Sequence, residues 1–150
     1  MTAEQVFSIA NLMAVAGWVI LIVAGRVRWV ASLVTGAILP LLFALLYSFL
    51  IAAHWGEKTG GFGTLAQVHA LFTNDWLLLA GWVHYLAFDL FVGSWQVRDA
   101  QKHKISHLLV IPALILTFMF GPIGLLLYCI IRLVRVRSLR LDLATASSGS

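Results

Sequence analysis

Residues 76–95 read WLLLAGWVHYLAFDLFVGSW, and this stretch decides the fold. A helix of about 20 apolar residues crosses the hydrocarbon core of a bilayer, which is about 30 Å thick. Here His84 and Asp89 interrupt the apolar run near its middle. A charge at that depth costs about 2.5–3.5 kcal/mol, so such groups usually face a bundle interior, a cavity or a partner. The stretch therefore predicts a membrane-spanning helix whose polar positions are covered by neighbouring helices.

The two polar residues lie on different stripes of the predicted helix. At about 100° per residue, His84 and Asp89 are about 140° apart around the axis, so they do not form one tight pair. Aromatic side chains share these two stripes: Trp82, Tyr85, Phe88 and Phe91. One interpretation is structural, with hydrogen bonds to other helices. The other is functional, and we favour it because two such groups in one span are costly.

The composition predicts an integral membrane protein. Of 150 residues, 61% are hydrophobic and 11% are charged, and the mean hydropathy is +0.96. Soluble proteins have a much more polar composition. Four long apolar blocks cover residues 6–25, 29–53, 76–95 and 108–131. They predict an all-α, polytopic membrane protein: a bundle of four transmembrane helices in one domain over residues 1–143, with a flexible tail over residues 144–150. A β-barrel is excluded because its segments would be short and alternating.

The basic residues stand at the ends of these blocks. The net charge is +4, and a lysine or arginine at a span end meets anionic headgroups. We therefore expect the lipid bilayer, and no nucleic acid, as a partner. With four spans the positive charges divide evenly between the two sides, so they give no orientation. The first residues have the features of neither a signal peptide nor a transit peptide, so we expect the first block to be retained as a membrane span of a multi-pass protein.

Prolines and glycines mark places where the helices change course. We expect a kink or a close backbone approach at Gly36 and Pro40, which opens space between helices. Pro122 should bend or break the last block and free the carbonyl of Phe118. Residues 65–72 have helical spacing and predict a short interfacial or re-entrant helix, with an ordinary polar loop as the alternative. Asn74 is in the position of a helix N-cap before the third block.

Polar and indole side chains inside the apolar blocks have separate interpretations. Most tryptophans fall at span ends, the usual place for that ring. Trp18 and Trp82 do not, and we expect both to lie inside the bundle and line a pocket. Asn11 in the first block is expected to make a hydrogen bond between helices.

A metal site is a further hypothesis. Asp99, His103 and His107 recur at every fourth position, and two histidines so spaced beside a carboxylate suit a divalent metal. A solvated interfacial face is the alternative interpretation. If the following loop folds back against the third span, a divalent metal cofactor would have these ligands: His84, Asp89, Asp99 and His107.

Three runs in the C-terminal half resemble one family. They are GWVHYLAFDLFVG, RDAQKHKISH and FMFGPIGLLLY, and they resemble the ABA-deficient-4-like membrane proteins, whose plant members are implicated in forming neoxanthin from violaxanthin. The positions that carry the pattern are Trp82, His84, Asp89, Leu90, Phe91, Asp99, His107, Pro122 and Gly124. The first two blocks match in length and hydropathy only. Without the transit peptide of the plastid members, the resemblance implies a bacterial relative in the plasma membrane.

The resemblance implies a carotenoid or other isoprenoid as the apolar small-molecule partner. Conversion of an epoxide into an allenic alcohol needs a general acid for the opening oxygen and a base for a vinylic proton. Asp89 and His84 are the expected catalytic pair of such a xanthophyll isomerase. The substrate would enter from the lipid and contact Trp18, Trp82, Tyr85, Phe88, Phe91 and Pro122. A non-catalytic carotenoid or lipid carrier and a membrane metal-site protein are the alternatives.

Overall fold

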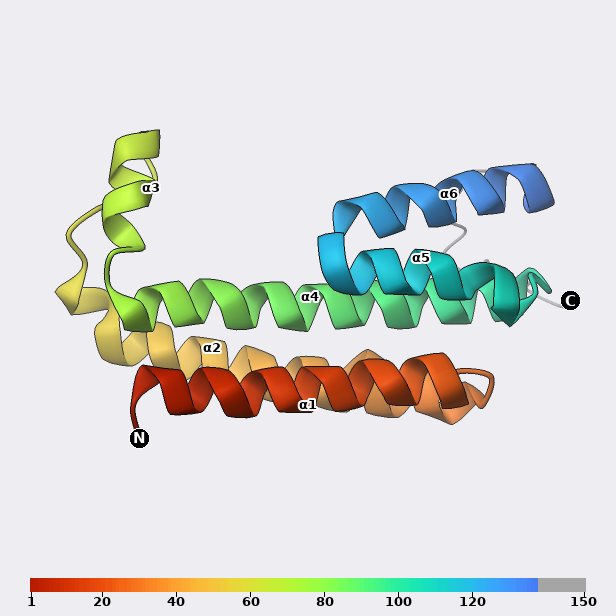
Figure 1. Ribbon diagram of the computed structural model, residues 1–150, viewed down its shortest axis with the longest axis horizontal. Coiled ribbons are helices and arrows are strands. Elements are labelled where there is room, and N and C mark those ends of the chain that lie inside the picture. Colours follow the sequence, from red (N-terminus) through yellow and green to blue (C-terminus); the bar gives the residue numbers. More distant parts are fainter. Residues whose placement is uncertain (138–150) are drawn as a thin grey trace, which may run out of the picture.

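The computed structural model describes residues 1–137, and Figure 1 shows their arrangement. The elements are α1 (Ala3–Ala24), the π-helix η1 (Val30–Ile38), α2 (Leu39–His54), the 3₁₀ helix η2 (Trp55–Glu57), α3 (Leu65–Leu71), α4 (Asp75–Lys102), α5 (His107–Phe120) and α6 (Pro122–Val136). The predicted all-helical class is confirmed, since these 137 residues contain no strand. The predicted tail over residues 144–150 lies outside this range.

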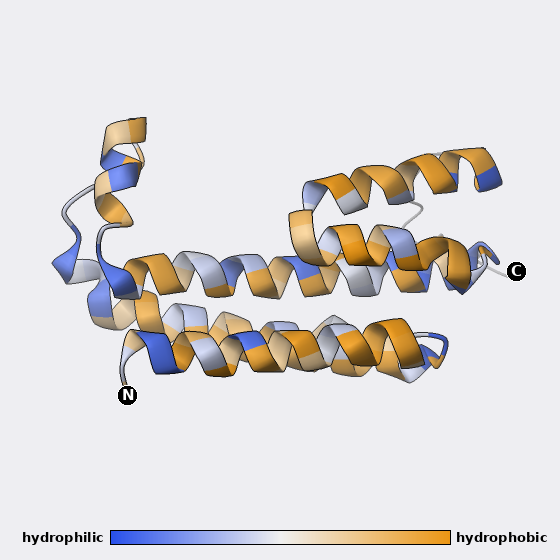
Figure 2. Cartoon of the chain, in the orientation of Figure 1, coloured by the Kyte–Doolittle hydropathy of each residue, from blue (hydrophilic) through white to orange (hydrophobic). Residues whose placement is uncertain are grey.

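Within residues 1–137, three helices are long and apolar enough to cross a membrane: α1, the continuous helix Val30–Glu57, and α4. Figure 2 shows hydrophilic residues gathered mainly at the two ends of the molecule, with apolar residues along the helices between them. α4 is the central helix, because it packs against α1, η1, α2, α5 and α6. The expected N-cap is confirmed, since the Asn74 side chain accepts hydrogen bonds from the N–H groups of Trp76 and Leu77.

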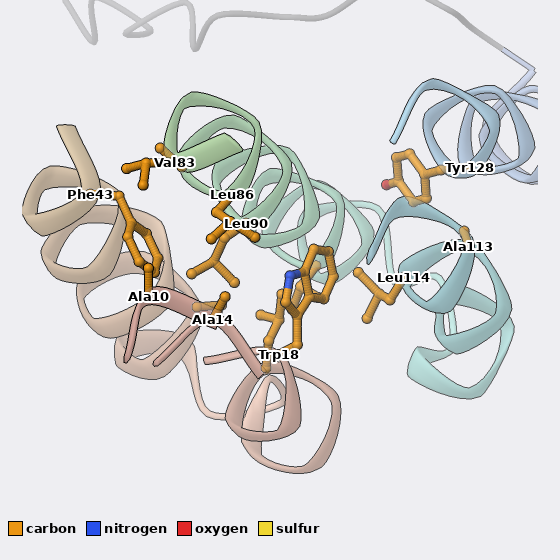
Figure 3. Packing of buried hydrophobic residues seen from close by; sticks show 14 of the residues in the cluster. Ala10, Ala14, Trp18, Phe43, Val83, Leu86, Leu90, Ala113, Leu114 and Tyr128 are labelled. Atoms are coloured by element: carbon orange, nitrogen blue, oxygen red, sulfur yellow. The ribbon is translucent and has the colours of Figure 1, made fainter. Parts of the chain in front are cut away.

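The buried core lies around α4, and Figure 3 shows it from close by. Val83, Leu86 and Leu90 of α4 meet side chains of the neighbouring helices. On the α1 side small residues, Ala10 and Ala14, allow the helices to approach closely. The apolar residues 76–95 therefore form the axis of the bundle.

The fourth apolar block is two helices and not one crossing helix. α5 and α6 each measure about 21–23 Å, less than the roughly 30 Å hydrocarbon core. The chain reverses at Gly121, whose φ of +44° favours glycine, and Pro122 begins α6. α6 then runs back to the end of the molecule where α5 began (Figure 1). The prediction of a single span over residues 108–131 was wrong on this point.

Close backbone packing holds the two arms of this hairpin together. A Cβ added at Gly124 would collide with the backbone of Thr117 and the carbonyl of Ala113. The Pro–Ile–Gly sequence thus has two structural uses: proline begins the second arm, and glycine lets that arm lie against the first. We call residues 107–136 the hairpin.

The second span has an unusual first half. A π-helix occupies Val30–Ile38 and continues directly into α2, so Pro40 lies inside the span and its missing N–H leaves a carbonyl of the preceding turn without a helical partner. The guanidinium of Arg98 from α4 lies against Gly36 and donates to the Ala31 carbonyl at 3.2 Å. The expected close approach at Gly36 is confirmed, and its partner is a cationic side chain.

The connection between the second span and α4 contains the expected short helix. α3 covers Leu65–Leu71, and the Thr64 side chain caps it by accepting from the Gln67 N–H at 3.2 Å. The helix stands at the end of the bundle away from the hairpin's termini (Figure 1). Leu71 of α3 and the following Phe72 line a hollow at this end of the seam between α2 and α4.

Candidate functional site

A lipid-facing hollow lies where the π-helix and α2 meet α4. Its volume is about 400 Å³, and its lining residues come from the second span and from α4: Gly36, Ala37, Pro40, Leu41, Ala44, Ala87, Phe88 and Phe91. The small side chains and the proline leave room that bulkier residues would fill. Phe88 and Phe91 are 59% and 47% exposed, so they are open to acyl chains or to an apolar ligand. The expected opening near Pro40 is thus present.

A second hollow of about 460 Å³ continues along the same seam beneath α3. Its lining includes Tyr47, Ile51, Trp55, Phe62, Leu77 and His84. The His84 ring lies 4.6 Å from the ring of Phe88, which lines the first hollow, and 5.5 Å from the ring of Tyr47. The two hollows therefore adjoin at His84. We call the two hollows together the α2–α4 groove.

The α2–α4 groove carries few polar groups. His84 and Tyr47 are the ionisable residues in its lining, and the rest of the lining is aliphatic, aromatic or glycine. An imidazole next to a phenol can accept and return a proton beside an apolar ligand. Sequence reasoning selected His84 but not Tyr47. The sequence feature that could have identified Tyr47 is its spacing on α2: it lies three residues after Ala44 and four before Ile51, so all three share one face of the helix.

Asp89 lies on the opposite side of α4, against the turn of the hairpin. Its two carboxylate oxygens are 2.9 and 3.1 Å from the point where a Cβ on Gly121 would stand. Within residues 1–137, its buried Oδ2 has no hydrogen-bond partner. None of the hollows described here is lined by both Asp89 and His84. The structure therefore does not bring the predicted acid and base to one surface.

Tyr85 connects α4 to the carbonyl that Pro122 leaves without its helical partner. Its hydroxyl donates to the Phe118 carbonyl oxygen at 2.7 Å. The predicted release of this carbonyl is confirmed, and the opening faces α4. Pro122 itself is exposed at the start of α6. Tyr85 and Pro122 thus belong to the hairpin side and do not line the groove.

Buried polar contacts fix the hairpin to α4 further along. Asp99 accepts from the Arg132 Nε–H at 2.7 Å and from the Tyr128 hydroxyl at 2.6 Å. Arg132 is only 1% exposed. One helical turn earlier, the Gln96 amide donates to the Thr117 hydroxyl at 3.0 Å. Asp99 is therefore the counter-charge of a buried arginine.

The predicted metal set is not assembled. α4 ends at Lys102, and Lys104 has a φ of +56°, so His107 begins a new helix and does not continue the stripe of Asp99 and His103. The Nε2 of His107 lies 2.8 Å from the Ile22 carbonyl oxygen at the end of α1. Over residues 1–137, no group of three or more histidine, cysteine or acidic side chains could hold a metal ion.

The two central indoles have different surroundings. Trp18 is 3% exposed and packs against Phe118 with a centroid distance of 5.6 Å, so its predicted interior position is confirmed. Trp82 is 41% exposed, and its Nε1–H donates to the Asn11 side-chain oxygen at 2.8 Å. The interior placement of Trp82 was wrong, whereas the interhelical hydrogen bond predicted for Asn11 is confirmed.

Comparison with known proteins identifies the family. A family model described as ABA DEFICIENT 4-like matches residues 5–128, which include the first two spans as well as the runs around His84, Asp99 and Pro122. The searches of curated proteins and of solved structures gave no match. The matched range covers most of the 150 residues and ends inside α6. The chain therefore belongs to the ABA DEFICIENT 4-like family.

Proposed function

We propose that this protein binds a carotenoid or a similarly long isoprenoid in the α2–α4 groove and isomerises it by proton transfer at His84. One observation carries the proposal: His84 stands where two apolar, lipid-facing hollows adjoin. A ligand lying along the groove would pass directly over the imidazole. Membership of the ABA DEFICIENT 4-like family supports the choice of a carotenoid-related ligand.

The dimensions and the lining of the groove suit a long, slender, apolar molecule. From Gly36 to Trp55 the seam runs for about 28 Å at about 1.5 Å per residue, close to the thickness of a hydrocarbon core. Aromatic rings along α4 offer flat contact surfaces to a conjugated chain. Entry requires no passage through water, because Phe88 and Phe91 lie at the lipid-facing surface. A bilayer-soluble polyene is therefore the class of ligand that we propose.

The proposed chemistry is an isomerisation with no net oxidation. A base removes a vinylic proton, the electron pair forms the new double bond, the epoxide C–O bond breaks, and the oxygen receives a proton. His84 would act as the base. Tyr47, whose ring lies 5.5 Å from the imidazole, would supply the proton to the oxygen. Such positioned proton transfers contribute about 10²–10⁴-fold to a rate.

A non-catalytic carotenoid or lipid carrier is the second candidate function. The position of Asp89 favours it, because this carboxylate lies against Gly121 on the hairpin side and not beside His84. A carrier needs the groove but no acid–base pair. Both candidates predict bound pigment, and they differ in whether a product forms.

The test uses a host that makes epoxy-xanthophylls and expresses wild type, His84→Phe or Asp89→Asn. Pigments in the cells and pigment bound to protein purified in mild detergent are measured by chromatography, absorption and mass spectrometry. We expect wild type to bind pigment and yield a product of unchanged mass. The His84→Phe variant should bind pigment but form no product, because phenylalanine keeps an aromatic ring at this position and removes the base. Asp89→Asn should still form product.

Three results would change this conclusion. Wild type without bound pigment in all xanthophyll backgrounds would refute the proposal. Bound pigment without product would replace the isomerase with the carrier. Product that is lost in Asp89→Asn and kept in His84→Phe would move the chemistry to the hairpin side of α4.

A further inference from the structure

A basic hollow of about 570 Å³ opens at the turn between α1 and η1, next to the C-terminal end of α4. Its lining residues are Arg26, Arg28, Ser32, Arg98, Gln101 and Lys102. Of the lining residues within the described range 1–137, four are cationic and none is acidic. The pigment proposal makes no use of this hollow, whose charge calls for an anionic ligand.

Arg98 is the innermost of these cations and is partly buried. One of the guanidinium's five N–H donors bonds to the Ala31 carbonyl at 3.2 Å. Within residues 1–137, no carboxylate lies within ion-pair distance of this guanidinium, whereas the buried Arg132 has Asp99 at 2.7 Å. A cation withdrawn from water without a counter-charge is unfavourable. A ligand anion in the hollow would supply that charge.

Local hydrogen bonds hold the rim of the hollow in place. The Gln101 amide of α4 donates to the Gly25 carbonyl at 2.6 Å, which ties the end of α1 to α4. The Ser32 hydroxyl donates to the Arg28 carbonyl at 2.8 Å. The turn that carries Arg26 and Arg28 is therefore fixed on both sides before any ligand arrives.

The hollow adjoins the end of the α2–α4 groove. The Arg98 guanidinium lies against Gly36 and 5.9 Å from the centre of the Phe91 ring. Gly36 and Phe91 both line the groove. A molecule with an anionic head in the hollow could thus place an apolar chain in the groove without crossing a helix.

The hairpin also determines which membrane surface this end faces. Because α6 returns to the end where α5 begins, eight of the nine lysines and arginines in residues 1–137 gather there (Figure 1): Arg26, Arg28, Arg98, Lys102, Lys104, Arg132, Arg135 and Arg137. Lys58 is at the other end. The positive-inside rule then places the basic end in the cytoplasm, where the leaflet carries anionic lipids.

We propose that the basic hollow binds the phosphate of a phosphate ester whose long apolar chain lies in the α2–α4 groove in place of the pigment. A phospholipid and a polyprenyl phosphate share this chemistry. Arginine binds phosphate through paired, charge-assisted hydrogen bonds, and two or more cations converge here. The placement of the chain rests on the groove of the proposed function, whereas the phosphate site is independent of pigment.

The test measures ligand retention by native mass spectrometry of the purified full-length protein. The ligands are phosphatidylglycerol, phosphatidylcholine, farnesyl phosphate and inorganic phosphate. The variants are Arg26→Gln/Arg28→Gln, Arg98→Gln and the charge-matched control Arg135→Gln/Arg137→Gln, which alters exposed cations outside the hollow at the same end. The first double variant changes only exposed side chains of a turn, so folding is not at issue.

We expect wild type to retain phosphatidylglycerol or farnesyl phosphate in preference to phosphatidylcholine, and the ester retained more strongly identifies the source. Arg26→Gln/Arg28→Gln and Arg98→Gln should weaken that retention at least about tenfold, while the control keeps it. The first double variant should still bind pigment, which separates this site from the pigment proposal. Equal loss in the control, or no preference over phosphatidylcholine, would overturn the site. Displacement of the ester by an equal concentration of inorganic phosphate would overturn the placement of its chain.

Discussion

The two sides of α4 are built differently. On the α2 side, Phe88 and Phe91 are exposed along an apolar groove, and the polar side chains in it are those of His84 and Tyr47. On the hairpin side, specific polar contacts cross between helices, chief among them the bond between Asp99 and buried Arg132. One helix thus presents an open, ligand-sized surface and a closed, hydrogen-bonded one.

This difference predicts that ligand binding and the stability of the fold depend on different sides of α4. Apolar surfaces attract one another weakly inside lipid, so helices there are held by close packing and by interhelical hydrogen bonds. The hairpin side has both. On the groove side, the hydrogen bonds between helices lie beyond Phe88 and Phe91: the Ser94 hydroxyl donates to the Thr35 hydroxyl at 2.9 Å, and Arg98 donates to the Ala31 carbonyl at 3.2 Å. The exposed rings of Phe88 and Phe91 are left available to a ligand. Substitutions on the two sides should therefore affect different properties: stability on the hairpin side, and ligand binding or turnover on the groove side.

The largest expected effect is on the hairpin side, from Asp99→Ala. The substitution leaves the Arg132 guanidinium buried without its carboxylate, and loss of one partner of a buried pair costs about 3–5 kcal/mol. Thermal unfolding in detergent should show a strongly lowered midpoint. The control is Asp75→Ala, which removes an exposed acid in the first turn of the same helix, where a charge contributes about 0.3–1 kcal/mol. Equal stability of the two variants would contradict a closed, ion-paired side.

A smaller loss is expected from Gly121→Ala at the hairpin turn. Alanine is strained at a φ of +44°, and its Cβ would stand about 3 Å from the carboxylate of Asp89. Backbone strain of this kind costs about 1–3 kcal/mol. The unfolding midpoint should fall measurably. Gly56→Ala serves as the control, because nothing lies within 4 Å of a Cβ at that position. A variant as stable as wild type would mean that the chain does not reverse tightly at Gly121.

The smallest expected effect on stability comes from a matched pair of tyrosines. Tyr85→Phe removes the hydrogen bond to the Phe118 carbonyl and should cost about 1 kcal/mol of unfolding free energy. Tyr47→Phe, on the groove side, should leave the unfolding midpoint unchanged while it slows product formation. Measuring both quantities for both variants tests whether the two sides are separable. A reversed pattern would assign the chemistry to the hairpin side.

Several features of the fold could be predicted because their causes are local. The apolar run around His84, the cap at Asn74, the helical spacing of residues 65–72 and the carbonyl freed by Pro122 all depend on neighbours in sequence. The reversal at Gly121 could not be predicted. A Gly–Pro pair fits either a kinked span or a hairpin, and the choice depends on contacts with distant residues such as Asp99 and Arg132.

The candidate site was predictable only in part, for the same reason. Helical geometry placed His84 and Asp89 on different stripes of α4. In the structure, His84 contacts α2 and Asp89 contacts the turn of the hairpin. Which neighbour covers which stripe is a tertiary property that no local spacing encodes. Tyr47 and the π-helix at Val30–Ile38 were missed because their significance comes from contacts across the bundle, with His84 and Arg98.

Pigment retention by two tryptophan variants of α2 tests the central claim most directly. Ala44 lines the groove, whereas Ala52 is exposed on the same helix and is not among the groove's lining residues. Both proteins are purified in mild detergent from a carotenoid-producing host, and bound pigment per protein is read from the absorption spectrum. Ala44→Trp should lose the pigment because the indole fills the hollow, and Ala52→Trp should keep it. Equal pigment in the two variants would contradict ligand binding between α2 and α4.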